Sequence, residues 1–191
     1  MAVLTRPRAI AAGVALLIAG AVAGGLVAGR GDWADACATG ENGVIECAAG
    51  ERPDAPAAAG ELLDGTRYDL ASARGNVVVV NFWGSWCSPC RAEAKELEQT
   101  YQATKASGVE FLGINNRDDR DAAIAFERGR VTYPSLFDPA NRLGLDFDIP
   151  PGATPSTVIL DREGRIAMVI RRSVLASELT PLVQRVAAEH G

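Results

Sequence analysis

The stretch from Val77 to Cys90, which reads VVVVNFWGSWCSPC, constrains the fold more than any other part of the chain. It begins as an unbroken apolar run, which is typical of a strand buried on both faces near the centre of a sheet. It ends with two thiols at the expected start of a helix, where the helix dipole stabilises a thiolate. Because a thiolate is the nucleophile of disulfide exchange, the spacing of Cys87 and Cys90 predicts a redox-active pair.

Composition narrows the function classes that this pair can serve. The 191-residue chain carries a net charge of -5 and shows no dense group of Lys and Arg, which argues against a nucleic-acid partner. His190 is the single histidine and lies next to the last residue. A Cys-His protease or a histidine-ligated metal enzyme needs an imidazole inside the fold, so we expect neither, and we expect no metal site.

Residues 1–30 have the pattern of an export segment. Arg6 and Arg8 precede an uncharged run over residues 9–29, which is long enough for a bilayer span of about 20 residues. The run exceeds a signal-peptide core of roughly 7–15 residues, so we expect a single-pass membrane anchor with its N-terminus inside. A cleaved signal, with a small-residue site at residues 21–23, is the alternative and would give a secreted protein. In both cases the remaining chain lies on the extracytoplasmic side.

Residues 31–60 are rich in Ala, Gly, Pro and acidic residues, and we expect a flexible tether there. The segment contains Cys37 and Cys47. In an oxidising compartment, a pair this close most simply forms a structural disulfide. The alternative is a second redox pair that exchanges electrons with Cys87 and Cys90.

The folded domain is expected over residues 61–191. Patterning predicts a hairpin over 62–68 with Asp64-Gly65 at its turn, strands over 77–83, 109–114, 156–160 and 165–171, and a short extended piece over 133–137. Helices are expected over 88–107, 118–130, 138–147 and 177–189. This order predicts an α/β fold with a central mixed β-sheet, flanking helices and an inserted helical segment.

Two segments carry a resemblance to a known family, namely NFWGSWCSPCRAE at residues 81–93 and TPSTVILD at residues 154–161. With them the chain resembles the thioredoxin superfamily, and within it the membrane-tethered extracytoplasmic branch typified by TlpA and ResA. The resemblance covers about residue 60 to the C-terminus. It implies a thioredoxin-like fold, a cis peptide bond before Pro155 beside the cysteines, and exchange chemistry that needs no bound cofactor.

The resemblance also bears on proton transfer. Thioredoxin has a buried aspartate on its central strand, where this chain has Asn81. In the ResA-like branch a glutamate three residues after the second cysteine is implicated instead, and Glu93 occupies that position. A carboxylate at i+3 from Cys90 lies on nearly the same helix face and can accept or return a thiol proton. The alternative is that Glu93 is one of several solvated acids on this helix.

We therefore predict Cys87 as the attacking cysteine, nearer solvent, and Cys90 as the cysteine that resolves the mixed disulfide. Glu93 is the third predicted catalytic residue. Trp86, Thr154 and Pro155 are predicted to border the groove that binds the partner backbone.

The predicted function is that of an extracytoplasmic thiol-disulfide oxidoreductase. By resemblance, it reduces disulfides of exported proteins, such as the cysteines of apocytochrome c before haem attachment, and is recharged by a membrane electron donor of the CcdA/DsbD type. The runner-up is a general disulfide oxidant or repair enzyme, and a thiol peroxidase of the same fold is a further alternative. A copper module would need a histidine or methionine near the cysteines, and a four-cysteine zinc module fails on the spacing of Cys37 and Cys47.

Overall fold

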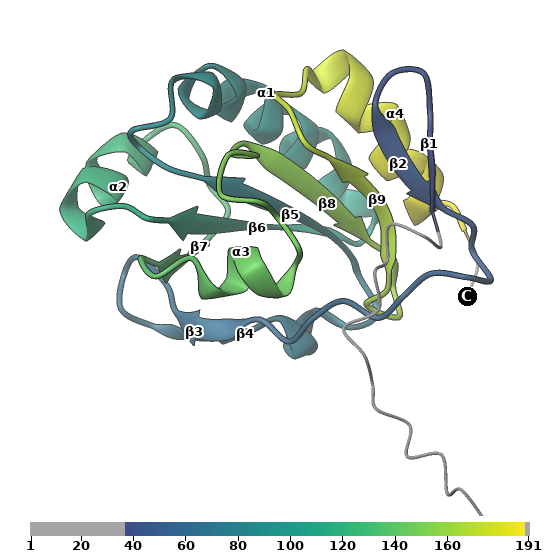
Figure 1. Cartoon of the computed structure of the whole chain (residues 1–191), viewed down its shortest axis with the longest axis horizontal. Coiled ribbons are helices and arrows are strands. Elements are labelled where there is room, and N and C mark those ends of the chain that lie inside the picture. Colours follow the sequence, from purple (N-terminus) through teal and green to yellow (C-terminus); the bar gives the residue numbers. More distant parts are fainter. Residues whose placement is uncertain (1–36, 190–191) are drawn as a thin grey trace, which may run out of the picture. The chain divides into compact units, whose positions relative to one another are not determined.

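The computed structural model describes residues 37–189, and its centre is a seven-stranded mixed sheet (Figure 1). The spatial order of the strands is β1-β2-β9-β8-β5-β6-β7. Their bounds are β1 Cys37–Thr39, β2 Val44–Cys47, β5 Val77–Trp83, β6 Val109–Asn116, β7 Ser135–Asp138, β8 Ser156–Leu160 and β9 Ile166–Ile170. The prediction of a central mixed sheet is confirmed.

The apolar run at β5 occupies the middle of this sheet. β5 pairs in parallel with β6 and antiparallel with β8, and every one of its residues is buried. Because side chains alternate along a strand, Val77 and Val79 enter one core cluster while Val78 and Val80 enter the other. A strand buried on both faces has no polar side, which explains the unbroken run of valines.

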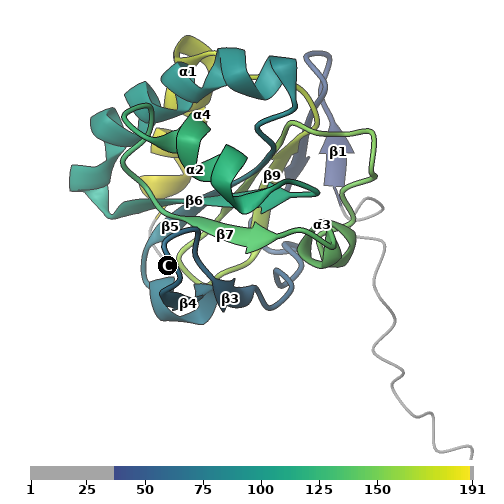
Figure 2. The same cartoon turned by 90° about the vertical axis from the view of Figure 1, so that its left-hand side faces the viewer.

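Helices cover one face of the sheet, and a hairpin with a short helix covers the other (Figures 1 and 2). The helices are α1 Ser88–Thr104, α2 Arg120–Glu127, α3 Arg142–Asp146 and α4 Ala176–Ala187, with short 3-10 helices at Leu70–Ala73 and Lys105–Ser107. Leu97 of α1 and Leu179 of α4 pack in the same cluster as Val79. The hairpin of β3 (Ala59–Glu61) and β4 (Arg67–Asp69) and residues beside α3 pack against the opposite face, where Tyr68 and Phe147 join the second cluster.

The expected elements are present, with shifted ends. The turn of the β3–β4 hairpin contains Asp64 and Gly65, and Gly65 has φ +88. The segment that ends at residue 107 stops before Gly108, whose φ of +73 suits a residue without a Cβ. β6 runs two residues beyond the predicted end at 114, to Asn116. This extension carries polar residues to the edge of the sheet where β5 also ends.

The structure differs from the sequence prediction over residues 37–60, where we expected a flexible tether. β1 and β2 form a hairpin that extends the main sheet, since β2 pairs antiparallel with β9. Beyond the hairpin, the side chain of Arg52 is buried and its guanidinium meets Asp161 at 3.3 Å. Ala58 is also fully buried. The apolar pair Val44-Ile45 explains the difference, because it can pack on the core although the surrounding composition is that of a loop.

The predicted membrane anchor, residues 1–30, lies outside the described residues. Between residues 37 and 189, no helix is both long enough and apolar enough to cross a bilayer.

Candidate active site

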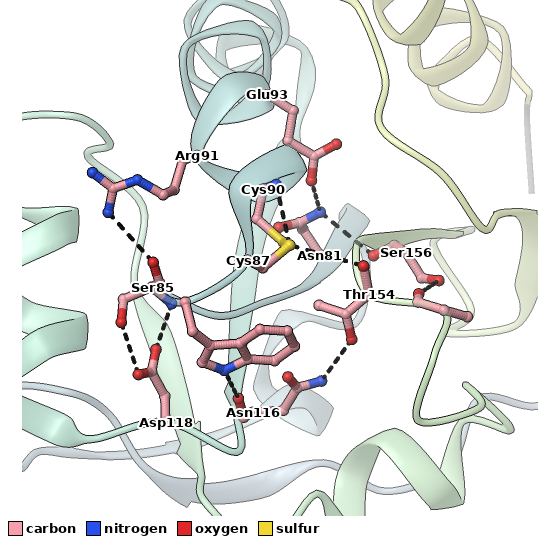
Figure 3. The surroundings of a disulfide bond; sticks show 12 residues. Asn81, Ser85, Cys87, Cys90, Arg91, Glu93, Asn116, Asp118, Thr154 and Ser156 are labelled. Carbon is pink, nitrogen blue, oxygen red and sulfur yellow. Dashed lines mark hydrogen bonds between the residues drawn. A yellow bond between two sulfur atoms is a disulfide. The ribbon is translucent and has the colours of Figure 1, made fainter.

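The two cysteines lie where the central strand gives way to the first helix. β5 ends at Trp83, and Cys87 is the N-cap of α1, with Pro89 in the first turn. Proline suits this position because the first helical N–H groups have no partner inside the helix. Cys87 and Cys90 form a disulfide with Cα atoms 5.3 Å apart, and the backbone N–H of Cys90 donates to Cys87 Sγ at 3.2 Å (Figure 3). An N–H aimed at Sγ favours negative charge there once the bond is reduced.

The exposure of the two cysteines differs from the prediction. We expected Cys87 nearer to solvent, but Cys87 and Cys90 are each 3% exposed in the disulfide form. The adjacent Trp86 is 49% exposed and so marks the surface beside the disulfide. The physical reason is the loop before β8, which covers Cys87: the carbonyl oxygen of Thr154 lies 3.8 Å from Cys87 Sγ.

That loop contains the cis peptide bond Thr154-Pro155, which confirms the expectation drawn from the resemblance. It places Pro155 and Thr154 beside the disulfide although they follow it by more than sixty residues. The structure therefore brings together Cys87, Trp86 and the proline loop. Their roles in exchange remain predictions.

Glu93 is 2% exposed, so the alternative of a solvated acid on the helix surface does not fit the structure. Its Oε1 accepts a hydrogen bond from Asn81 Nδ2 at 3.0 Å, and its Oε2 accepts one from the Val174 N–H at 3.1 Å. Burial raises the pKa of Glu93 to about 7, while the hydrogen bonds from Asn81 and Val174 act in the opposite direction. A carboxyl group with a pKa near neutrality can both accept and release a proton under physiological conditions.

Asn81 occupies the position on β5 nearest to this carboxylate. Its amide nitrogen also lies 3.4 Å from the carbonyl oxygen of Ser156 (Figure 3). The same nitrogen lies 3.2 Å from Thr157 Oγ1. A side-chain amide does not titrate near neutral pH, so Asn81 cannot take up the proton of the Cys90 thiol. Its hydrogen bond to Glu93 holds the carboxylate in place, and Glu93 is the group that titrates.

Sequence reasoning missed the polar segment at the end of β6. The carboxylate of Asp118 accepts hydrogen bonds from the N–H of Ser85 at 2.5 Å and from its hydroxyl at 2.8 Å. Trp86 Nε1 donates to the carbonyl oxygen of Asn116 at 3.3 Å. The available signal was the run Asn-Asn-Arg-Asp-Asp directly after a buried strand parallel to β5, because the ends of parallel strands meet at one sheet edge.

The second disulfide, Cys37–Cys47, joins directly opposed residues of β1 and β2. Strands β9 and β8 separate β2 from β5. Three strand spacings amount to roughly 14 Å, too far for direct exchange with the Cys87–Cys90 pair inside the folded sheet. A structural role for Cys37 and Cys47 fits this placement.

Within residues 37–189, no group of three or more His, Cys, Asp or Glu side chains is placed to hold a metal ion.

The sequence matches the AhpC/TSA family over residues 52–169. The chain belongs to the AhpC/TSA family. This chain is 30% identical over 128 residues to the thiol-disulfide oxidoreductase ResA of Bacillus subtilis. The matched region covers 66% of this chain and 70% of that protein. It is 37% identical over 117 residues to the thiol:disulfide interchange protein DsbE of Allochromatium vinosum, covering 58% of this chain and 62% of that protein.

The fold of this chain is also similar to that of a solved structure. A secreted thiol-disulfide isomerase from Corynebacterium glutamicum superposes with a TM-score of 0.73 at 31% identity, covering 76% of this chain and 92% of that chain. The fold is thus thioredoxin-like, and the protein is a thiol-disulfide oxidoreductase of the ResA and DsbE type.

Proposed function

We propose that this thiol-disulfide oxidoreductase works outside the cytoplasm as a reductase of disulfides in exported proteins. The observation that carries the proposal is the buried carboxylate of Glu93, which lies three residues beyond Cys90 on the same helix. It supplies a nearby proton acceptor to a cysteine that is otherwise surrounded by apolar groups.

The reaction follows from the positions of the groups. The thiolate of Cys87 attacks one sulfur of the substrate disulfide, forms a mixed disulfide and releases one substrate thiolate, which takes a proton from water. Glu93 accepts the proton of the Cys90 thiol, and the resulting thiolate attacks Cys87 Sγ. The second substrate thiolate leaves and takes the proton held by Glu93, so the substrate gains two electrons and two protons and the enzyme ends with the Cys87–Cys90 disulfide.

Electrostatics favour the reducing direction. A thioredoxin-like protein becomes a strong oxidant when its reduced form is stabilised as a thiolate. While Glu93 is ionised it disfavours a thiolate on Cys90, since both groups are buried and lie three positions apart on α1. The reduced pair is therefore less stabilised as a thiolate and is the better electron donor, and Cys90 becomes a thiolate only as Glu93 takes up its proton.

The substrate class we propose is the cysteine pair of apocytochrome c before haem attachment. An extracytoplasmic reductant needs electrons from inside the cell, so we propose a membrane donor of the CcdA/DsbD type and a membrane anchor at residues 1–30. The uncharged run over residues 9–29, with Arg6 and Arg8 before it, supports the anchor. The similarity to ResA and DsbE supports the assignment to this type of oxidoreductase.

A second candidate is a general disulfide oxidant or repair enzyme for exported proteins. The similarity to a solved structure described as a secreted thiol-disulfide isomerase favours it. The redox potential distinguishes the two functions, because a repair or oxidising enzyme needs a more positive value.

The test is the midpoint potential of the Cys87–Cys90 pair in the full chain, measured by equilibration with thiol redox buffers. A reductase predicts a value in the range of about -200 to -270 mV. A value between about -180 mV, typical of a disulfide isomerase, and about -120 mV, typical of a strong oxidant, would contradict the proposal and favour the second candidate. The Cys37→Ser/Cys47→Ser variant is the matched control, since it retains the Cys87–Cys90 pair alone and should give the same potential.

A further inference from the structure

The active site has two walls that come from separate parts of the chain. The tryptophan turn (residues 84–87) precedes α1, and the proline loop (residues 149–155) precedes β8. Thr154 of the proline loop lies against Cys87 Sγ, so segments from two distant parts of the chain border the attacking sulfur.

The tryptophan turn is held from the end of β6. Asp118 binds Ser85, and the carbonyl oxygen of Asn116 accepts a hydrogen bond from the indole of Trp86. The indole folds back over Gly84 so closely that a Cβ added to Gly84 would lie 2.5 Å from Trp86 Nε1. This wall has little freedom to move by itself.

The proline loop closes on itself through one backbone hydrogen bond, from the Ala153 N–H to the carbonyl oxygen of Pro150 at 2.9 Å. Pro150 and Pro151 lack an N–H, and both are exposed. Two side chains reach the loop from the end of β6: Arg117 Nη2 donates to the carbonyl oxygen of Pro151 at 2.6 Å, and Asn116 Nδ2 lies 3.5 Å from Thr154 Oγ1. The shorter contact, from Arg117, is the stronger tie.

Arg117 also touches the other wall. Its guanidinium carbon lies 5.0 Å from the centroid of the Trp86 ring, within the range of a cation–π contact. One side chain thus spans the tryptophan turn and the proline loop. Its backbone is left-handed, with φ +49, a conformation that is uncommon for a residue with a Cβ and that clusters at functional sites.

We propose that Arg117 is a positioning residue that sets the spacing of the two walls and thereby determines how well the protein reacts with polypeptide disulfides. The inference rests on the proposed exchange function and adds a specificity determinant to it. A small disulfide needs only Cys87, whereas a polypeptide must also fit between Trp86 and the proline loop. Loss of Arg117 therefore slows reaction with a polypeptide more than reaction with a small disulfide.

The experiment compares two second-order rate constants of the fully reduced chain. One is measured with a short, uncharged synthetic peptide that carries a single disulfide, and the other with hydroxyethyl disulfide. The variant is Arg117→Asn, because asparagine tolerates the left-handed conformation but cannot reach Pro151. The matched control is Arg91→Gln: Arg91 is also exposed and donates to the carbonyl oxygen of Ser85 at 3.3 Å, and we find no contact between it and the proline loop within the described residues.

We expect Arg117→Asn to lower the ratio of the peptide rate constant to the small-disulfide rate constant about tenfold, since misplacement by about 1 Å can cost up to a hundredfold in rate. We expect Arg91→Gln to leave this ratio unchanged. An unchanged ratio in Arg117→Asn would overturn the inference. An equal fall of the ratio in Arg117→Asn and Arg91→Gln would also overturn it, because it would indicate an effect of removing a positive charge. If the asparagine variant does not fold, Arg117→Lys serves in its place, and the same ratio must fall because lysine lacks the planar group that stacks and donates together. Failure of the unmodified protein to reduce either disulfide would contradict the proposed function instead.

Discussion

Replacing Glu93 with glutamine in the oxidised protein tests the account of the buried carboxylate. Burial raises the pKa of Glu93 to about 7 in the folded protein, above its ordinary value of 4.5. The folded form therefore binds the proton more tightly than the unfolded chain does. The contribution of Glu93 to the free energy of unfolding is fully present below a pH of about 4.5 and is lost as the pH rises through about 7.

The magnitude follows from the difference between the two pKa values. A difference of about 2.5 corresponds to about 3 kcal/mol at 1.36 kcal/mol per pKa unit. Part of this loss of stability occurs below about pH 5.5, because Glu93 of the unfolded chain is already ionised at that pH. Between about pH 5.5 and pH 8.5 we expect Glu93 to reduce the free energy of unfolding by about 2 kcal/mol.

The assay is urea denaturation of the oxidised protein and of Glu93→Gln at several pH values in this range. The disulfide form is used because its cysteines do not titrate. Glutamine offers one acceptor where Asn81 and Val174 present two donors, so the variant also carries a loss of stability that does not depend on pH. The decisive quantity is therefore the pH dependence of the difference between the two proteins. Parallel curves for the unmodified protein and Glu93→Gln would refute the reasoning, because they would mean that the carboxyl group does not titrate with a raised pKa.

Three further predictions concern the cysteines and Asn81. Cys90→Ser should accumulate mixed disulfides with partner proteins on non-reducing gels, while Cys87→Ser should accumulate none; trapping through Cys90 instead would reverse the assigned roles. Removing the Cys37–Cys47 bridge with serine at both positions should lower the free energy of unfolding by about 3 kcal/mol, the closure entropy of a short loop, and leave disulfide reduction by the folded protein intact. A loss of turnover without loss of stability would instead favour a second redox pair. In Asn81→Asp, a second carboxyl group replaces the amide whose nitrogen now lies 3.0 Å from Glu93 Oε1. Two negative charges this close repel each other, so the pair of carboxyl groups should keep one proton to a higher pH than Glu93 does in the unmodified protein. Carboxyl titration followed by infrared spectroscopy checks this, and an unshifted midpoint would contradict it.

Much of the site was predictable because its determinants are local in the sequence. The valine run indicates a strand buried on both faces, and Cys87-Ser-Pro-Cys90 after it indicates a helix start, since capping and side-chain periodicity act within a few residues. The cis bond before Pro155 followed from the resemblance. These features required no knowledge of which segments meet in space.

Other features depend on contacts between distant parts of the chain. The resemblance singles out Glu93 among the acids of α1, but only tertiary packing buries it and so raises its pKa, while the hydrogen bonds from Asn81 and from Val174, 81 positions away, act in the opposite direction. Residues 37–47 read as a tether until β9 provides an edge on which β2 pairs. Composition alone could not reveal that edge.

Taken by itself, the sequence determined the central strand, the dithiol at the helix start and the class of chemistry, because these follow from neighbouring residues. The tertiary structure alone decided that Cys87 is covered by Thr154, that Glu93 is buried and that Arg117 spans the two walls of the site. The physical reason is that desolvation and cross-chain hydrogen bonds depend on which segments pack together. The order of residues along any one segment does not specify that packing.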